Sequence, residues 1–100
     1  MTFKVDRTPA VNQQMRELAE RAKAARLNDS YADALRLMLE RLQNEPLEWG
    51  DPEHNAKHPG GIFCHGIVWP LLVRFTVYPD ERTVIIFDIR ALPSSPLAGP

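Results

Sequence analysis

One segment, Leu71–Leu92, constrains the fold of this chain more than any other, because it has the alternating pattern of a β-hairpin. The tripeptide Pro79-Asp80-Glu81 interrupts the alternation with residues typical of a turn. Pairing Val77 with Ile85 or Thr83 would gather the apolar side chains on one face: Val73, Phe75, Val77, Ile85, Phe87 and Ile89. A face this apolar needs a covering layer from the rest of the chain.

The opposite face of the predicted hairpin carries charge. Arg74 faces Asp88 in one of the two registers and lies diagonal to it in the other, and Arg90 follows on the same strand. A cross-strand charge pair of this kind contributes only about 0.2–1 kcal/mol. We therefore expect a mixed face that carries Arg74, Asp88 and Arg90.

Two amphipathic helices are expected to cover the apolar face. Thr8 is a suitable N-cap and Pro9 a suitable first helical residue for a helix whose stripe is partly alanine: Met15, Leu18, Ala19, Ala22 and Ala25. Asp29 or Ser30 can cap a second helix that ends at Pro46 and has an apolar face of Tyr31, Leu35, Met38, Leu39 and Leu42. The short connection between them predicts an antiparallel helical hairpin.

The remaining segments complete an α+β domain. Thr2–Arg7 and Ile62–Val68 alternate like strands, whereas Glu45–Gly61 is rich in glycine and proline and is expected to be a loop. We predict one domain over residues 1–92: an N-terminal strand, a helical hairpin, then a three-stranded antiparallel meander. The helices pack on one face of the resulting four-stranded sheet, and residues 93–100 form a flexible C-terminal tail.

Composition limits the classes of function. The net charge of −1 gives no global support for nucleic-acid binding, so such binding would need a local basic patch. The single cysteine, Cys64, excludes an internal disulfide and favours the cytoplasm. We find neither an apolar run long enough for a membrane span nor the apolar segment of a secretion signal.

The order of these elements resembles the RelE/ParE superfamily of toxins from bacterial toxin–antitoxin systems. The matching residues are Phe3-Lys4-Val5, Thr8-Pro9, the run from Leu35 through Leu42 and Pro46 to Gly50-Asp51-Pro52, Val73–Val77 and Arg82–Ile86. The resemblance covers about residues 2–92. It implies the toxin component of a type II toxin–antitoxin module. Such a toxin inhibits growth until a cognate antitoxin wraps the domain, and such a module stabilises plasmids.

The resemblance implies two possible targets for the open face of the sheet. RelE-like members cut messenger RNA on the ribosome, and ParE-like members inhibit DNA gyrase without hydrolysis. We expect ribosome-dependent messenger RNA cleavage. The alternatives are a ParE-like gyrase inhibitor and a non-catalytic toxin-fold protein that has kept only partner binding, through a sheet edge that could accept an antitoxin strand or a second copy in a homodimer.

RNA cleavage requires an activated 2′-hydroxyl, a stabilised phosphate charge and a protonated leaving oxygen, which suit histidine and basic side chains. The candidate catalytic residues are therefore Arg74, Arg90 and His65, and the candidate substrate-binding residues are Lys57 and His58. Each also has a simpler interpretation. Arg74 could pair with Asp88, Arg90 could end a solvated strand, His65 could be half-buried, and Lys57 and His58 could belong to a solvated loop.

A metal site is the less favoured interpretation of the histidines. His54, His58, Cys64 and His65 are residue types that bind zinc, but their spacing fits no standard zinc finger. Cys64 and His65 are also unsuited to act as a nucleophile and base, because adjacent strand residues point to opposite faces. We therefore expect no metal and no cofactor.

Overall fold

The computed structural model describes the backbone of residues 2–58 and 60–98, and the side chains in those ranges except for residues 52–58. The chain begins with strand β1 and the helices that follow it: β1 (Lys4–Arg7), α1 (Pro9–Ala24), α2 (Asn28–Asn44) and the short α3 (Pro46–Trp49). The remaining strands come next along the chain and are followed by one 3₁₀ turn: β2 (Asp51–His58), β3 (Gly61–Val68), β4 (Leu71–Tyr78), β5 (Thr83–Ala91) and the turn Pro96–Ala98.

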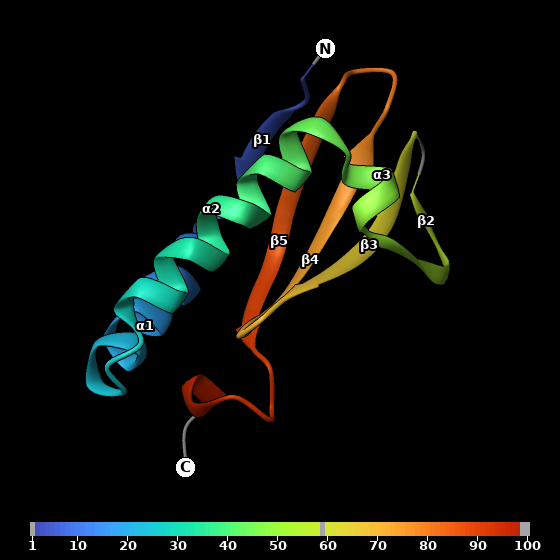
Figure 1. Ribbon diagram of the computed structural model, residues 1–100. Helices are drawn as coiled ribbons and strands as arrows, with labels where there is room; N and C mark the ends of the chain where they lie inside the picture. The colour runs from blue at the N-terminus through green and yellow to red at the C-terminus, as the bar shows by residue number, and fades with distance from the viewer. Residues whose placement is uncertain (1, 59, 99–100) are drawn as a thin grey trace.

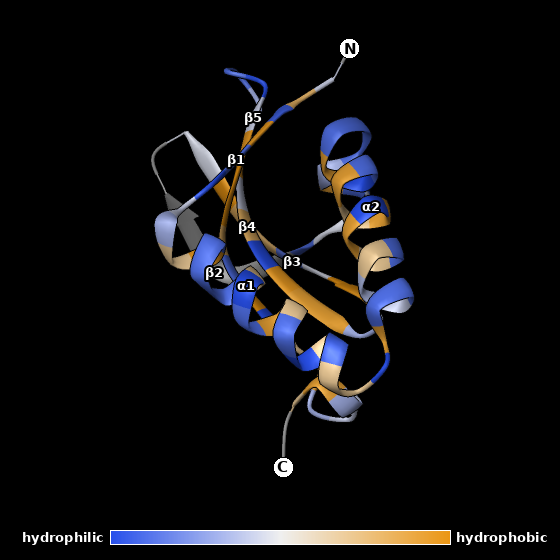
Figure 2. Ribbon diagram, turned by 90° about the vertical axis from the view of Figure 1, so that its left-hand side faces the viewer, coloured by the Kyte–Doolittle hydropathy of each residue, from blue (hydrophilic) through white to orange (hydrophobic). Residues whose placement is uncertain are grey.

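The described residues form an α+β fold with both long helices on one face of a single sheet, as predicted (Figure 1). The strand order is β1-β5-β4-β3-β2, with β1 parallel to β5 and the other neighbouring strands antiparallel. Figure 2 shows that hydrophobic residues line the inner side of α2, which faces the strands. The core lies between these layers and includes Leu18 and Ala22 of α1, Met38 and Leu42 of α2, and Phe75 of β4.

The start of α1 agrees with the prediction and the start of α2 does not. The hydroxyl of Thr8 accepts a hydrogen bond from the Val11 N–H at 3.2 Å, and Pro9 occupies the first turn of α1. Helix α2 instead begins at Asn28, with Leu27 at the N-cap and no side-chain cap. Its first turn therefore depends on packing rather than on capping by Asp29 or Ser30.

The hairpin of β4 and β5 contains a β-bulge that the sequence analysis missed. Arg74 faces Asp88, as expected, but Phe75 then pairs with Ile86 rather than with Phe87. The predicted pairing of Val77 with Ile85 or Thr83 is therefore wrong, because Val77 pairs with Val84. One extra residue in β5 reverses the facing of every side chain on the turn side of the bulge.

The bulge changes which side chains form the core. The buried apolar residues of β4 and β5 are Leu71, Val73, Phe75, Val77, Val84, Ile86 and Ile89. Ile85 and Phe87, which we expected among them, are only partly buried. Phe87 instead packs on Phe63 of β3, with ring centroids 5.6 Å apart.

The segment Glu45–Gly61 is not the loop that its glycine and proline content predicted. It contains α3 and the edge strand β2, which makes the sheet five-stranded. The Trp49 ring of α3 stacks on the Phe75 ring, with centroids 5.8 Å apart and planes 11° apart. A sheet edge tolerates proline and irregular pairing, and the register of β2 against β3 shifts between Pro52 and Lys57.

Part of the segment that we expected to be a flexible tail, residues 93–100, contacts the domain through Ser95 and Leu97. Leu97 is fully buried, and the Arg21 guanidinium of α1 donates a hydrogen bond to its carbonyl at 3.4 Å. The hydroxyl and the N–H of Ser95 both donate to the Leu92 carbonyl, which turns the chain back toward α1. Burial of one leucine side chain contributes about 1.5–3 kcal/mol, and the hydrogen bonds of Arg21 and Ser95 add to this anchor.

Candidate functional site

The structure brings the predicted catalytic residues His65, Arg74 and Arg90 to one hollow on the face of the sheet opposite the helices. Its volume is about 410 Å³, and Ile67 and Leu72 complete its lining. His65 pairs with Arg74, and Leu72 pairs with Arg90, so these side chains come from the neighbouring strands β3, β4 and β5. Paired residues in antiparallel strands point to the same face, which explains why residues distant in sequence share this hollow.

Arg90 is held in a fixed orientation by Asp88. Its Nε atom donates to Asp88 Oδ2 at 2.8 Å, and its Nη2 atom donates to Asp88 Oδ1 at 3.2 Å. The Asp88 side chain is 12% exposed, whereas the Arg90 side chain is 62% exposed. This two-point bond orders the guanidinium while most of it still faces solvent.

Gln14 of α1 completes the environment of Asp88. Its Nε2 atom donates to Asp88 Oδ1 at 2.9 Å, and its Oε1 atom accepts from the Ile89 N–H at 3.0 Å. Strand β1 pairs with β5 only as far as Ile86, so Gln14 covers the β5 edge beyond the end of β1. Sequence reasoning missed this residue, because nothing local distinguishes it from neighbouring polar residues.

The charge of Asp88 is stabilised despite its burial. Burial by itself would raise the pKa of this carboxyl group. Hydrogen bonds from Arg90 and Gln14, together with the positive charges of Arg90 and Arg74, outweigh that effect and hold the pKa below its ordinary value. Asp88 is therefore a carboxylate at neutral pH, and it orders Arg90.

His65 has the carboxylate of Asp51 as a neighbour. Its Nε2 atom lies 4.0 Å from Asp51 Oδ2, and the side chains of His65 and Asp51 are 37% and 86% exposed. A pair this open to solvent contributes little to stability. Because the His65 side chain is partly exposed and lines the hollow, its imidazole is accessible from there.

The other residues that the sequence analysis considered do not line this hollow in the described part of the structure. Lys57 and His58 belong to β2, where their backbone pairs with Ile62 and Gly61, nearer the start of β3 than His65. Their side chains, like that of His54, lie outside the described residues. Cys64 is fully buried on the helix side of β3, so it does not meet His65. Within the described side chains, no group of His, Cys, Asp and Glu is arranged to bind a metal ion.

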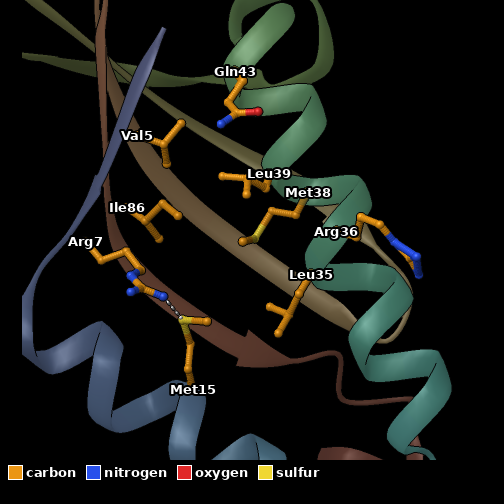
Figure 3. A pocket seen from close by; sticks show the side chains of 9 residues that line it. All are labelled: Val5, Arg7, Met15, Leu35, Arg36, Met38, Leu39, Gln43 and Ile86. Atoms are coloured by element: carbon orange, nitrogen blue, oxygen red, sulfur yellow. Dashed lines mark hydrogen bonds between the residues drawn. The ribbon is translucent and has the colours of Figure 1, made fainter.

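A second hollow lies between β1 and α2 and is mainly apolar (Figure 3). Its volume is about 610 Å³, and its apolar lining comprises Val5, Met15, Leu35, Met38, Leu39 and Ile86. Arg7, Arg36 and Gln43 add polar groups, and Figure 3 shows the Arg7 guanidinium directed at the Met15 sulfur. Such a surface suits docking of an apolar segment better than it suits catalysis. We refer to this hollow as the β1–α2 groove.

Comparison with protein families and with curated proteins found no family model and no curated protein that matches the chain. Among the helices in the described part of the chain, none is long and apolar enough to cross a lipid bilayer. The arguments for function therefore rest on the geometry of the two hollows and on the fold.

Proposed function

We propose that this protein is the toxin component of a type II toxin–antitoxin module and that it cleaves messenger RNA on the ribosome. The observation that carries the proposal is the gathering of His65, Arg74 and Arg90 around one open hollow. The α+β order of elements, with the helices on one face and the other face open, is also the order implied by the resemblance to RelE/ParE toxins.

The hollow offers the groups that RNA cleavage needs. His65 takes the proton from a ribose 2′-hydroxyl, whose oxygen then attacks the adjacent phosphorus. Arg74 and Arg90 stabilise the negative charge that develops on the phosphate oxygens. The bond from phosphorus to the 5′-oxygen breaks, water protonates that oxygen, and a 2′,3′-cyclic phosphate remains on the upstream fragment.

The local charge of the hollow favours a phosphate although the whole chain is weakly acidic. The net charge is −1, but the charged side chains that line the hollow are Arg74 and Arg90, with His65 beside them. Asp88 balances part of this charge by pairing with Arg90 and by facing Arg74, and Asp51 lies 4.0 Å from His65. The hollow therefore offers two guanidinium groups that can bind a phosphodiester group, with carboxylates beside them that keep the arginines ordered.

The experiment that tests this proposal is a cell-free translation reaction in which the cleavage sites on the messenger RNA are mapped. We expect Arg74→Ala to reduce the cleavage rate by about 100-fold or more, the usual effect of removing one transition-state donor. The matched control is Arg16→Ala, which removes the same charge from the exposed side of α1. Full cleavage by a folded Arg74→Ala variant would refute the proposed site.

A DNA-supercoiling assay separates the proposal from gyrase inhibition. Wild-type protein should leave gyrase activity unchanged while it inhibits translation. Inhibition of supercoiling, with messenger RNA intact, would instead support the ParE-like alternative. Normal growth on strong expression without a partner would favour a non-catalytic binding protein.

We also propose that the cognate antitoxin docks an apolar, acidic segment in the β1–α2 groove. The apolar lining suits such a segment, and the guanidinium of Arg7, which reaches into the groove beside the Met15 sulfur, gives charge complementarity to its carboxylates (Figure 3). We expect Leu39→Asp to abolish neutralisation by a small acidic protein encoded next to the gene, while toxicity remains. Leu37→Asp is the matched control, because Leu37 is 40% exposed and Leu39 is 42% exposed, but only Leu39 lines the groove. Equal neutralisation of both variants would exclude this groove.

A further inference from the structure

We infer that Phe63 and Phe87 form a base-stacking subsite beside the phosphate-binding hollow, so that the protein takes single-stranded RNA. The inference rests on the proposed function and adds a residue-level account of what else the substrate touches. The ring centroids of Phe63 and Phe87 are 5.6 Å apart, with an interplanar angle of 47°. Both side chains are partly exposed.

The β-bulge in β5 brings Phe87 to this face of the sheet. Without the extra residue, Phe87 would take the place opposite Phe75 and point into the core beneath the helices. Bulges commonly redirect side chains next to active sites. Here Phe87 is the extra residue of the bulge. The residue before it, Ile86, pairs with Phe75, and the residue after it, Asp88, pairs with Arg74.

Phe63 lies beside the hollow for a simpler reason. It precedes His65 on β3 by two residues, so both side chains project from the same face about 7 Å apart along the strand. Phe63 pairs with Thr76, and His65 pairs with Arg74, which places the aromatic pair next to the positive charges across β3 and β4. That separation is comparable to the length of one nucleotide.

An aromatic platform next to positive charge is the combination that binds single-stranded nucleic acid. Arginine holds the phosphate while an aromatic face stacks on the neighbouring base. A base within a duplex is already stacked on its neighbours and is not free to use such a platform. The two clusters together therefore favour an unpaired RNA strand over a duplex.

The test measures binding of wild-type protein to a short 2′-O-methylated oligoribonucleotide, which cannot be cleaved, and to an abasic oligomer of the same length. We expect the base-containing oligomer to bind about tenfold more tightly, since stacking on one aromatic side chain contributes about that factor or more. Binding should also displace the ring-proton resonances of Phe87 in the nuclear magnetic resonance spectrum, which needs no variant.

Leucine substitutions isolate the contribution of stacking, because they keep apolar bulk and remove the aromatic face. Phe87→Leu and, separately, Phe63→Leu should reduce the affinity for the base-containing oligomer about tenfold and leave the affinity for the abasic oligomer unchanged. Arg74→Ala should weaken both oligomers equally. Phe3→Leu is the matched control, because Phe3 is also an aromatic residue beside an arginine but does not line the hollow. Its ring centroid lies 4.8 Å from the guanidinium carbon of Arg82.

Two results would overturn the subsite. One is equal binding of the two oligomers by wild-type protein, which includes no binding of either. The other is a Phe87→Leu effect that is the same for both oligomers, because that pattern would mean a structural role. If either result is found and the protein still cleaves messenger RNA in the translation reaction, the stacking subsite is refuted and the proposed function stands. If either result is found and the protein does not cleave messenger RNA, both are refuted.

Discussion

Replacing Gln14 with alanine should destabilise this fold far more than a polar-to-alanine change on a helix surface normally does. The amide of Gln14 makes two bonds with atoms of β5 at once. Its Nε2 group donates to Asp88, an acceptor-only carboxylate, and its Oε1 atom accepts from the Ile89 N–H, a donor. Only one orientation of the amide satisfies both partners, so this side chain joins α1 to β5 in a defined register.

The expected loss follows from the groups left behind. Ile89 is 1% exposed, and leaving its N–H without an acceptor costs about 1–3 kcal/mol. The hydrogen bond to charged Asp88 contributes about 1.5–3 kcal/mol, near the lower limit here because Arg90 remains bonded to Asp88. The higher helix propensity of alanine returns a few tenths of a kcal/mol. We expect a net loss of about 2–4 kcal/mol.

Urea denaturation monitored by circular dichroism measures this loss as a change in the free energy of unfolding. The matched control is Gln13→Ala, because Gln13 is the preceding residue on α1 and bonds only with exposed side chains of the same helix. That variant should differ from wild type by less than about 0.5 kcal/mol. If Gln14→Ala and Gln13→Ala have equal stability, the edge of β5 does not depend on this side chain and our reasoning fails.

Three further predictions follow from buried polar groups and from one close approach. Asp88→Asn should lower the free energy of unfolding most at neutral pH. Because the folded-state pKa of Asp88 is lowered, its stabilising effect is complete above the ordinary value of 3.8 and is lost as pH falls through the folded value, so titrations of both proteins should converge in acid. Tyr31→Phe should cost about 1 kcal/mol by removing the hydrogen bond of 2.9 Å to the Met15 carbonyl. Burial raises the Tyr31 pKa, so wild type should lose this advantage as pH rises above the ordinary value of 10.0 through the folded value. Gly66→Ala would place a Cβ atom 2.5 Å from the Trp49 ring, so we expect a loss of about 1–3 kcal/mol and a changed near-ultraviolet circular dichroism spectrum.

The sequence predicted most elements of the fold because their signals are local. The hydrophobic spacing of α1 and α2 and the alternation of β3, β4 and β5 were sufficient to predict an α+β domain with helices on one face. Strand β2 carried no such signal. It forms at the open edge of β3, where backbone groups need partners, and no pattern within residues 51–58 indicates that.

The site was predictable in its composition but not in its surroundings. His65, Arg74 and Arg90 could be chosen because histidine suits proton transfer and arginine suits phosphate binding, and because strand alternation places Arg74 and Arg90 on the mixed face of the hairpin. Gln14 could not be chosen, because its partner Asp88 is 74 residues away and the contact depends on where α1 crosses the sheet edge. The position of Phe87 was predicted incorrectly, because the bulge breaks the alternation on which the prediction depended.

The amino-acid sequence by itself determined the two long helices and the strands β1, β3, β4 and β5, and it determined which charged residues remain on the uncovered face. These properties depend on side-chain periodicity, which acts over a few residues. Only the tertiary structure decided the register of β5, the burial of Leu97 and the hydrogen bond from Gln14 to Asp88. Each of those depends on two layers filling the same space, because close packing selects one register among several that local patterns allow.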